Sequence, residues 1–165
     1  MPLQKTIELA KRDKAEGKSA STQAGEFVKE EIDTIRKGKH GARSARQAIA
    51  IGLSKARRAG VDLKPPAKGK TSEKTRRSAE LAYRKGRQHA PVSKKRSLAT
   101  KHALEKESTS SASHKALSRQ AHSAARRRSA ADRSASARKA AATKGSAKRS
   151  AAAKKASLAR ARNKA

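Results

Sequence analysis

Apolar residues recur at helical spacing in the first third of the chain. The first three lie on one helix face, at i, i+4 and i+7: Leu3, Ile7 and Ala10. Pro2 and Gly17 bracket them, and proline favours the start of a helix as glycine favours the position after its end. The pattern therefore predicts a short helix within residues 1–20.

A second, longer apolar stripe follows a cluster of serine and threonine. Its members are Ala24, Val28, Ile32 and Ile35, with Phe27 on its flank. Ser21 or Thr22 can cap this helix, because their side-chain oxygens accept hydrogen bonds from the unpaired N–H groups of a first turn. Gly38 is a suitable residue to end it.

A third helix begins where Ser44 and Gln47 have the spacing of a capping box. Small and apolar residues beyond Ser44 fall on one arc of about 140°, counting about 100° per residue. These residues are Ala45, Ala48, Ile49, Gly52, Leu53, Ala56 and Ala59. Their small size would let another helix approach closely.

The same helix carries three arginines outside this arc, namely Arg46, Arg57 and Arg58, which we expect to point away from the packed face. Gly60 followed by Val61 predicts a Schellman ending, in which the valine folds back on the last turn. Residues 21–64 are thus predicted to form an αα-hairpin. Because so short a unit is near the lower limit for independent folding, we expect marginal stability or self-association through the hairpin.

The predicted fold class is all-α, and the predicted organisation has five parts. These are a short N-terminal helix (1–20), the helical hairpin (21–64), a Pro/Gly/Lys linker (65–71), separate basic helices without a core (72–128) and a low-complexity Ala/Ser/Lys/Arg tail (129–165). Within the fourth part, helices are expected at 72–85, 93–107 and 114–128. We expect the tail to be disordered with nascent helix, since helix nucleation is costly and its charges repel one another.

Charge divides the chain differently from apolar content. The chain carries 44 Lys and Arg against 13 Asp and Glu, a net charge of +31. Residues 1–35 hold six basic and seven acidic residues, whereas residues 36–165 hold 38 basic and six acidic ones. Such an imbalance opposes a compact state and calls for a polyanionic partner.

Several classes of protein are excluded or disfavoured. The absence of cysteine excludes disulfides and zinc–thiolate sites, and the five histidines have no i+3 or i+4 partner. No apolar run is long enough to span a membrane, and the N-terminus lacks the apolar core of a secretory signal. With no nucleophile motif and no core to form a pocket, we expect no enzyme, metal or cofactor. The expected location is the cytoplasm, in the nucleoid.

Sequence-nonspecific DNA binding through phosphate contacts is the predicted function. The principal contacts are expected in the tail, at Arg126, Arg127, Arg128, Arg133, Arg138, Lys139, Lys144, Lys148, Arg149, Lys154, Lys155, Arg160 and Arg162. Further contacts are expected around the hairpin, at Lys39, Arg43, Arg46, Arg57 and Arg58. Phe27 and Tyr83, the only aromatic residues, cannot form a platform on which bases stack, so base-specific recognition is not expected.

Two structural hypotheses refine this prediction. The hairpin is either a helix-turn-helix with residues 44–59 as its recognition helix, or a packing or dimerisation unit that displays a basic turn; its turn is longer than the usual three or four residues. In the tail, six cations at alternating spacings of five and six would form two opposite stripes on one continuous helix. A helix charged on two faces could bridge two duplexes, although an Ala-rich basic chain can show such spacing by chance.

Part of the chain resembles a family of small bacterial domains of unknown function. The stretches STQAGEFV (21–28) and GKHGARSARQAIAIGLSKARRAG (38–60) carry the likeness, above all the segment QAIAIGL. The resemblance covers about residues 21–64 and implies a bacterial source without an assigned activity. By composition alone the tail is similar to linker-histone tails and bacterial histone-like proteins, which implies DNA compaction; their Lys-Pro-Ala repeats are missing here.

Two other functions remain open. Structured RNA is as polyanionic as DNA, so an RNA-binding or ribosome-associated basic protein is the first alternative. A hydrophilic stress or scaffold protein is the second, in which the charge would serve solubility or contact with membrane surfaces.

Overall fold

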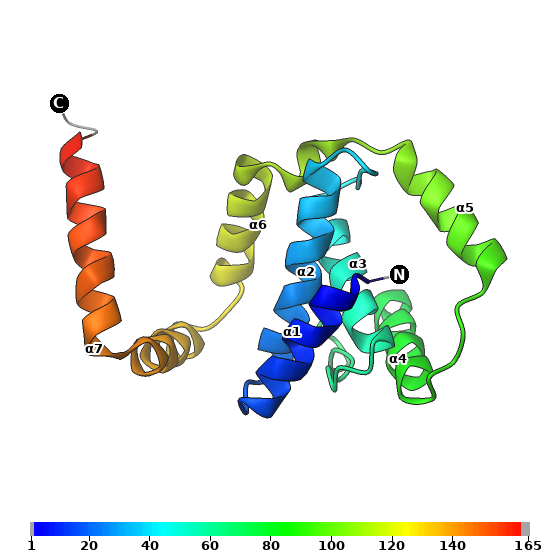
Figure 1. The fold of residues 1–165 in the computed structure, drawn as a ribbon, viewed down its shortest axis with the longest axis horizontal. Helices are drawn as coiled ribbons and strands as arrows, with labels where there is room; N and C mark the ends of the chain where they lie inside the picture. Colours follow the sequence, from blue (N-terminus) through cyan, green and yellow to red (C-terminus); the bar gives the residue numbers. More distant parts are fainter. Residues whose placement is uncertain (1, 163–165) are drawn as a thin grey trace. The chain divides into compact units, whose positions relative to one another are not determined.

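The computed structural model describes residues 2–162, with residues 143, 144, 146–149 and 159 described by their backbone alone. These residues form helices and no strand, which confirms the predicted all-α class. The helices are α1 (Gln4–Ala15), α2 (Ala20–Arg36), α3 (Ala45–Arg58), α4 (Glu73–Arg87), α5 (Lys94–Glu105), the 3₁₀ helix η1 (Thr109–Ala112), α6 (His114–Arg126) and α7 (Ala130–Arg162) (Figure 1). The chain divides into unit 1, Met1–Gln120, and unit 2, Ala121–Ala165.

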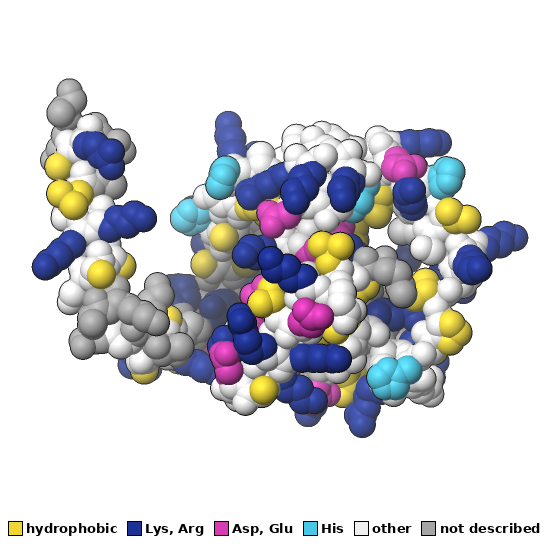
Figure 2. All heavy atoms as spheres, in the orientation of Figure 1, with side chains coloured by type: hydrophobic (Ala, Val, Ile, Leu, Met, Phe, Trp, Pro, Cys, Tyr) yellow, Lys and Arg dark blue, Asp and Glu magenta, His cyan; other side chains and the backbone are white. Residues whose placement is uncertain are grey.

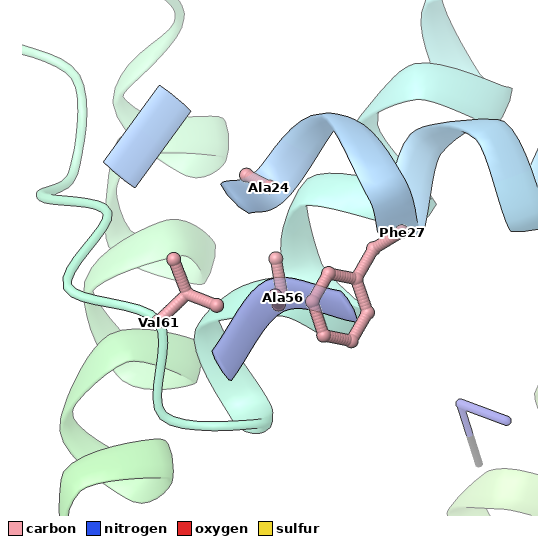
Figure 3. Close-up of a cluster of buried hydrophobic side chains, with 5 residues drawn as sticks. Ala24, Phe27, Ala56 and Val61 are labelled. Carbon is pink, nitrogen blue, oxygen red and sulfur yellow. The ribbon is translucent and has the colours of Figure 1, made fainter. Parts of the chain in front are cut away.

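The first core of unit 1 joins α1 to the hairpin formed by α2 and α3. Its buried members are Ala10, Ala24, Phe27, Ala56 and Val61, with Ile7, Ala20, Leu53, Ala59 and Leu63 packed around them. Figure 3 shows the Phe27 ring beside Ala56, with Val61 on the far side of that alanine. Phe27 is the largest of the five buried members, three of which are alanines.

The ends of α3 follow the sequence signals, whereas α2 begins at Ala20 after Ser19 without a side-chain cap hydrogen bond, so the prediction that Ser21 or Thr22 caps α2 was wrong. The Ser44 hydroxyl accepts a hydrogen bond from the Gln47 N–H at 3.3 Å, as a capping box requires, while the Gln47 side chain reaches the N–H of Arg43 at 2.9 Å. At the other end of α3, the Val61 N–H donates to the Ala56 carbonyl and the Gly60 N–H donates to the Arg57 carbonyl. This pair of bonds is the predicted Schellman ending.

The close approach of α2 to α3 depends on Gly52. A Cβ built on Gly52 would lie 2.6 Å from the Cα of Val28, well inside van der Waals contact. The small residues of α3 therefore do what their spacing predicts, which is to let a neighbouring helix backbone come close.

A second core brings in a segment that the sequence pattern does not connect to the hairpin. Ile35, Ala42, Ala48 and Ala112 are buried together, with Ile32 beside them, so η1 packs against α2 and α3. The turn after α2 is held by the same segment: the Gly41 N–H donates to the Leu104 carbonyl at 2.9 Å and the Ala42 N–H donates to the Ser108 carbonyl at 3.1 Å.

Helix α4 also differs from the separate basic helix that we expect from the sequence. It packs on α3 through a buried face of Ala79, Ala82 and Gly86. A Cβ on Gly86 would lie 1.9 Å from the Arg57 carbonyl oxygen, so the contact is backbone against backbone. The apolar face of α4 is too narrow for its buried area to predict packing. Its small residues gain their contacts because the two helix backbones approach closely.

Unit 2 has no described side chain that is buried, in contrast to unit 1. Helix α7 is interrupted at Gly145, whose φ of 69° and ψ of 167° are not helical. Its sequence predicts a disordered or nascent-helical tail, and the structure describes two helical pieces on either side of this glycine. With no described side chain of these pieces buried, they depend chiefly on alanine's helix propensity.

We predict that Gly52→Ala destabilises the protein by about 1–3 kcal/mol, because the added methyl group must displace the backbone of α2. Gly25→Ala is the matched control: the site lies in α2, nothing lies within 4 Å of the new Cβ, and a gain of about 0.5–1 kcal/mol is expected. Urea unfolding followed by circular dichroism measures both. Equal effects of the two substitutions would contradict the close helix contact.

Candidate nucleic-acid interface

The exposed cations of unit 2 make up most of the predicted interface. The side chains of Arg126, Arg127, Arg128, Arg133, Arg138, Lys139, Lys154, Lys155, Arg160 and Arg162 are all exposed. The side chains of Lys144, Lys148 and Arg149 lie outside the described residues. Asp132 is the sole acidic residue after Glu107, so this unit contains almost no negative charge of its own.

A capping network fixes the start of α7. The Ser129 hydroxyl donates to the Asp132 carboxylate at 2.8 Å and accepts from the Asp132 N–H at 3.0 Å. Arg128 donates to the Asp132 carbonyl at 2.9 Å and Arg133 donates to the Arg128 carbonyl at 2.7 Å. These two arginines therefore contact the backbone of the turn with part of their guanidinium groups and expose the rest.

The two opposite charge stripes do not run the length of the tail. A continuous helix is required to keep the spacing of five and six in register, and the break at Gly145 falls in its middle. The spacing of the charges is therefore kept in register only within each of the two helical pieces. The stripes of Arg133, Lys144 and Lys155 and of Arg138, Arg149 and Arg160 therefore lack the single helix that would align them.

The hairpin residues of the predicted interface have different environments. Lys39, Arg43 and Arg46 are exposed, as expected. Arg57 is only 7% exposed, and its Nε donates to the Leu63 carbonyl at 3.0 Å, so the prediction that it points away was wrong. Burial lowers the pKa of Arg57. Its place at the last turn of α3, between the returning chain and α4, explains why a position outside the apolar arc is nonetheless covered.

Arg58 is half-buried, and its Nη1 is buried with no hydrogen-bond partner in the described part of the chain. Neither Arg57 nor Arg58 therefore belongs to an open basic surface. Of the five hairpin residues predicted to contact phosphates, Lys39, Arg43 and Arg46 are the exposed ones.

Helix α3 is poorly suited to enter a DNA groove. It contacts α2, α4 and η1, and of its 14 residues only Arg46 and Ala50 are fully exposed. A recognition helix needs a free face of several side chains that reach base edges. The geometry therefore favours the packing-unit interpretation of the hairpin over the helix-turn-helix interpretation.

A buried ionic cluster beneath the basic turn was missed by the sequence reasoning. Glu31 of α2 is 0% exposed, and Lys55 of α3 places its Nζ 2.6 Å from Glu31 Oε2. His40 Nε2 lies 3.5 Å from Glu31 Oε1, and Glu30 Oε1 lies 3.8 Å from the same Lys55 Nζ. Neither Glu31 oxygen has a partner with hydrogen-bond geometry among the described residues, so the contact is chiefly electrostatic.

One sequence signal could have found this cluster. Glu31 lies four residues after Phe27 and four before Ile35, and all three are fully buried. A carboxylate at the centre of an i, i+4, i+8 apolar series must be paired inside the fold, because burying an isolated charge is costly. Through His40, this pairing connects the α2–α3 core to the basic turn.

The described residues contain neither a metal site nor a membrane-spanning helix. Residues 2–162 contain no group of three or more His, Asp or Glu that could hold a metal ion. Within the same residues, no helix has the length and apolar character needed to cross a membrane.

The comparisons with known proteins give no relative. No family model, no curated protein and no solved structure matches the chain. The resemblance of residues 21–64 to a bacterial domain family therefore stays a prediction.

We predict that Lys55→Met destabilises the protein by about 3 kcal/mol, because it leaves the Glu31 carboxylate buried without its closest cation. Adding Glu31→Leu should recover most of this loss, since an apolar pair can replace a buried ion pair without penalty. Urea unfolding of both single variants and the double variant measures the coupling. Additive effects of the two substitutions would show that the pair is not coupled.

Proposed function

We propose that this protein is a sequence-nonspecific DNA-binding protein of the nucleoid, which binds through Lys and Arg contacts to phosphates. One observation carries the proposal: the described part of unit 2 exposes its predicted cations and buries no side chain, and its one carboxylate, Asp132, is engaged in capping α7. A segment with no buried side chain among its described residues and a single acidic residue gains little from folding on itself. A bound polyanion supplies the negative charge that this segment lacks.

Counterion release is the physical basis of this binding. Each Lys or Arg that neutralises a phosphate frees a condensed cation from the DNA, so affinity falls steeply as salt rises. This contribution does not depend on base sequence, and it suits cations spread along an extended helical tail rather than gathered in a pocket.

The environments of the two aromatic residues support backbone contact over base recognition. Phe27 is buried in the first core, where no base can reach it. Tyr83 donates a hydrogen bond to Asp62, and the Arg87 guanidinium lies 5.8 Å from the centre of its ring. With Phe27 buried, Tyr83 is the one aromatic ring that is even half-exposed, and a single ring is not a stacking platform.

We predict a salt slope, d log K/d log [salt], near −9 for full-length protein on duplex DNA, as expected when about ten phosphates are neutralised. Two duplexes of equal length and unrelated sequence should give the same affinity and the same slope. Fluorescence anisotropy across a range of salt concentrations measures both. A slope near zero, or a strong preference for one duplex, would contradict the proposal.

Purification with and without nuclease identifies the natural partner. Under the proposal, DNA fragments copurify with the protein, and nuclease treatment removes them. Recovery of structured RNA in their place would instead favour the RNA-binding alternative. Recovery of no nucleic acid at low salt would favour the hydrophilic stress or scaffold alternative.

A further inference from the structure

Two segments that are far apart in the sequence meet where α2 ends, and neither of them contains an acidic residue. Residues 36–46 and 108–120 together hold seven Lys or Arg and no Asp or Glu. We call these seven cations the composite basic surface: Arg36, Lys37, Lys39, Arg43, Arg46, Lys115 and Arg119. Figure 1 shows η1 and the start of α6 beside the end of α2, and Figure 2 shows dark-blue side chains close together over that region.

The backbone beneath this surface is fixed by tertiary contacts. The two hydrogen bonds from Gly41 and Ala42 to residues 104 and 108 hold the turn against the later segment. A Cβ on Gly41 would lie 1.9 Å from the Glu107 carbonyl oxygen, so the two chains touch backbone to backbone. Ala42 of the turn and Ala112 of η1 are both buried in the second core. The turn is therefore held in place rather than free to rearrange.

Two arginines connect the segments directly. Arg36 Nε donates to the Ala112 carbonyl at 2.9 Å, and Arg46 Nε donates to the Gln120 side-chain oxygen at 3.1 Å. Each bond uses one of the five N–H donors of a guanidinium group. The remaining donors keep the planar fork that binds two phosphate oxygens at once.

The other members of the surface are exposed and are not neutralised. Lys37, Lys39, Arg43, Lys115 and Arg119 are all exposed. In the described structure, none of the seven cations has an ion pair with a carboxylate, whereas Arg12, Lys18, Lys55, Arg76, Arg77 and Lys101 elsewhere in unit 1 each have one. The nearest carboxylates along the chain, Asp33 and Glu107, are half-buried.

We propose that the composite basic surface is a second binding site for the phosphate backbone of duplex DNA, formed by unit 1 without the tail. The inference depends on the proposed function and adds a preformed site to it. Fixed cations on a packed backbone lose little conformational freedom on binding, unlike those of the tail. If four of the seven cations neutralise phosphates, unit 1 alone contributes about −4 to the salt slope.

Full-length variants separate the two sites. The tail-neutral variant replaces every Lys and Arg of residues 126–162 by Gln, which removes the contacts of unit 2. The surface set adds Lys39→Gln, Arg43→Gln, Lys115→Gln and Arg119→Gln, four cations whose side chains make no hydrogen bond within the described residues. The matched control set adds Lys5→Gln, Lys29→Gln, Arg84→Gln and Arg96→Gln, which remove the same charge from exposed positions of unit 1.

Anisotropy on a duplex of fixed length is the measurement, with helix content checked by circular dichroism. We expect the tail-neutral variant to bind with a slope of about −4, the control set to retain that slope, and the surface set to bind much more weakly with a slope closer to zero. In the background of the native tail, which avoids any folding defect of the tail-neutral variant, the surface set should reduce the slope by three to four and the control set should not.

Three results overturn the inference. Equal binding by the surface and control sets shows that unit 1 contributes only diffuse charge. Loss of all binding in a folded tail-neutral variant, while the wild-type protein still binds, shows that the tail acts alone. Absence of salt-dependent binding by the wild-type protein contradicts the proposed function itself, and the second site with it.

Discussion

Close approach of backbones at glycine is the constraint on which unit 1 depends. The chain has few large apolar residues, so it cannot build a core by filling space with side chains. Gly52 brings α2 against α3, Gly86 brings α4 against the end of α3, and Gly41 brings the basic turn against the segment after α5. At each position an added methyl group would collide with a neighbouring main chain. Alanine and glycine therefore supply contact by proximity, and Phe27 and Ile35 are the largest apolar side chains that are fully buried.

Acidic and basic residues are distributed differently between unit 1, which has a packed core, and unit 2, which has no buried side chain among its described residues. The carboxylates lie almost entirely in unit 1, where several are paired with lysine or arginine and one, Glu31, lies at the centre of the hairpin. The two segments of the composite basic surface contain no acidic residue, and the tail contains one, Asp132. Positive charge is therefore in excess at this surface and along the tail, where phosphates can reach it, which is the physical link between this fold and the proposed function.

The sequence predicts the elements of this structure better than it predicts their packing. The apolar stripe of α3, the Ser44 cap and the Gly60–Val61 ending are local signals, and the structure has them as predicted. The first two stripes were partly wrong, since Leu3 is 61% exposed and Phe27 is fully buried rather than on the flank. The docking of α4 and η1 could not be predicted, because alanine and glycine faces give no signal in apolar area. The same limitation misplaced Arg57, whose burial results from the chain that returns over it after Gly60.

One part of the candidate interface could likewise be predicted from the sequence, and the other part could not. The exposed cations of the tail follow from composition alone, because nothing apolar is present to cover them. The composite basic surface depends on hydrogen bonds between residues 36–46 and 108–120, which no spacing rule connects. The continuous two-stripe helix failed for a local reason: a single glycine with positive φ interrupts a spacing that needs an unbroken helix.

Hydrogen–deuterium exchange of the full-length protein, with and without duplex DNA, tests the central claim most directly. In the free protein, we predict protected amides in α2 and α3 and fast exchange throughout α7, because no core covers that helix. With DNA, protection should appear in α7, in residues 36–46 and in α6, while α1 and α4 stay unchanged. No change on adding DNA, or new protection confined to α1 and α4, would contradict the account.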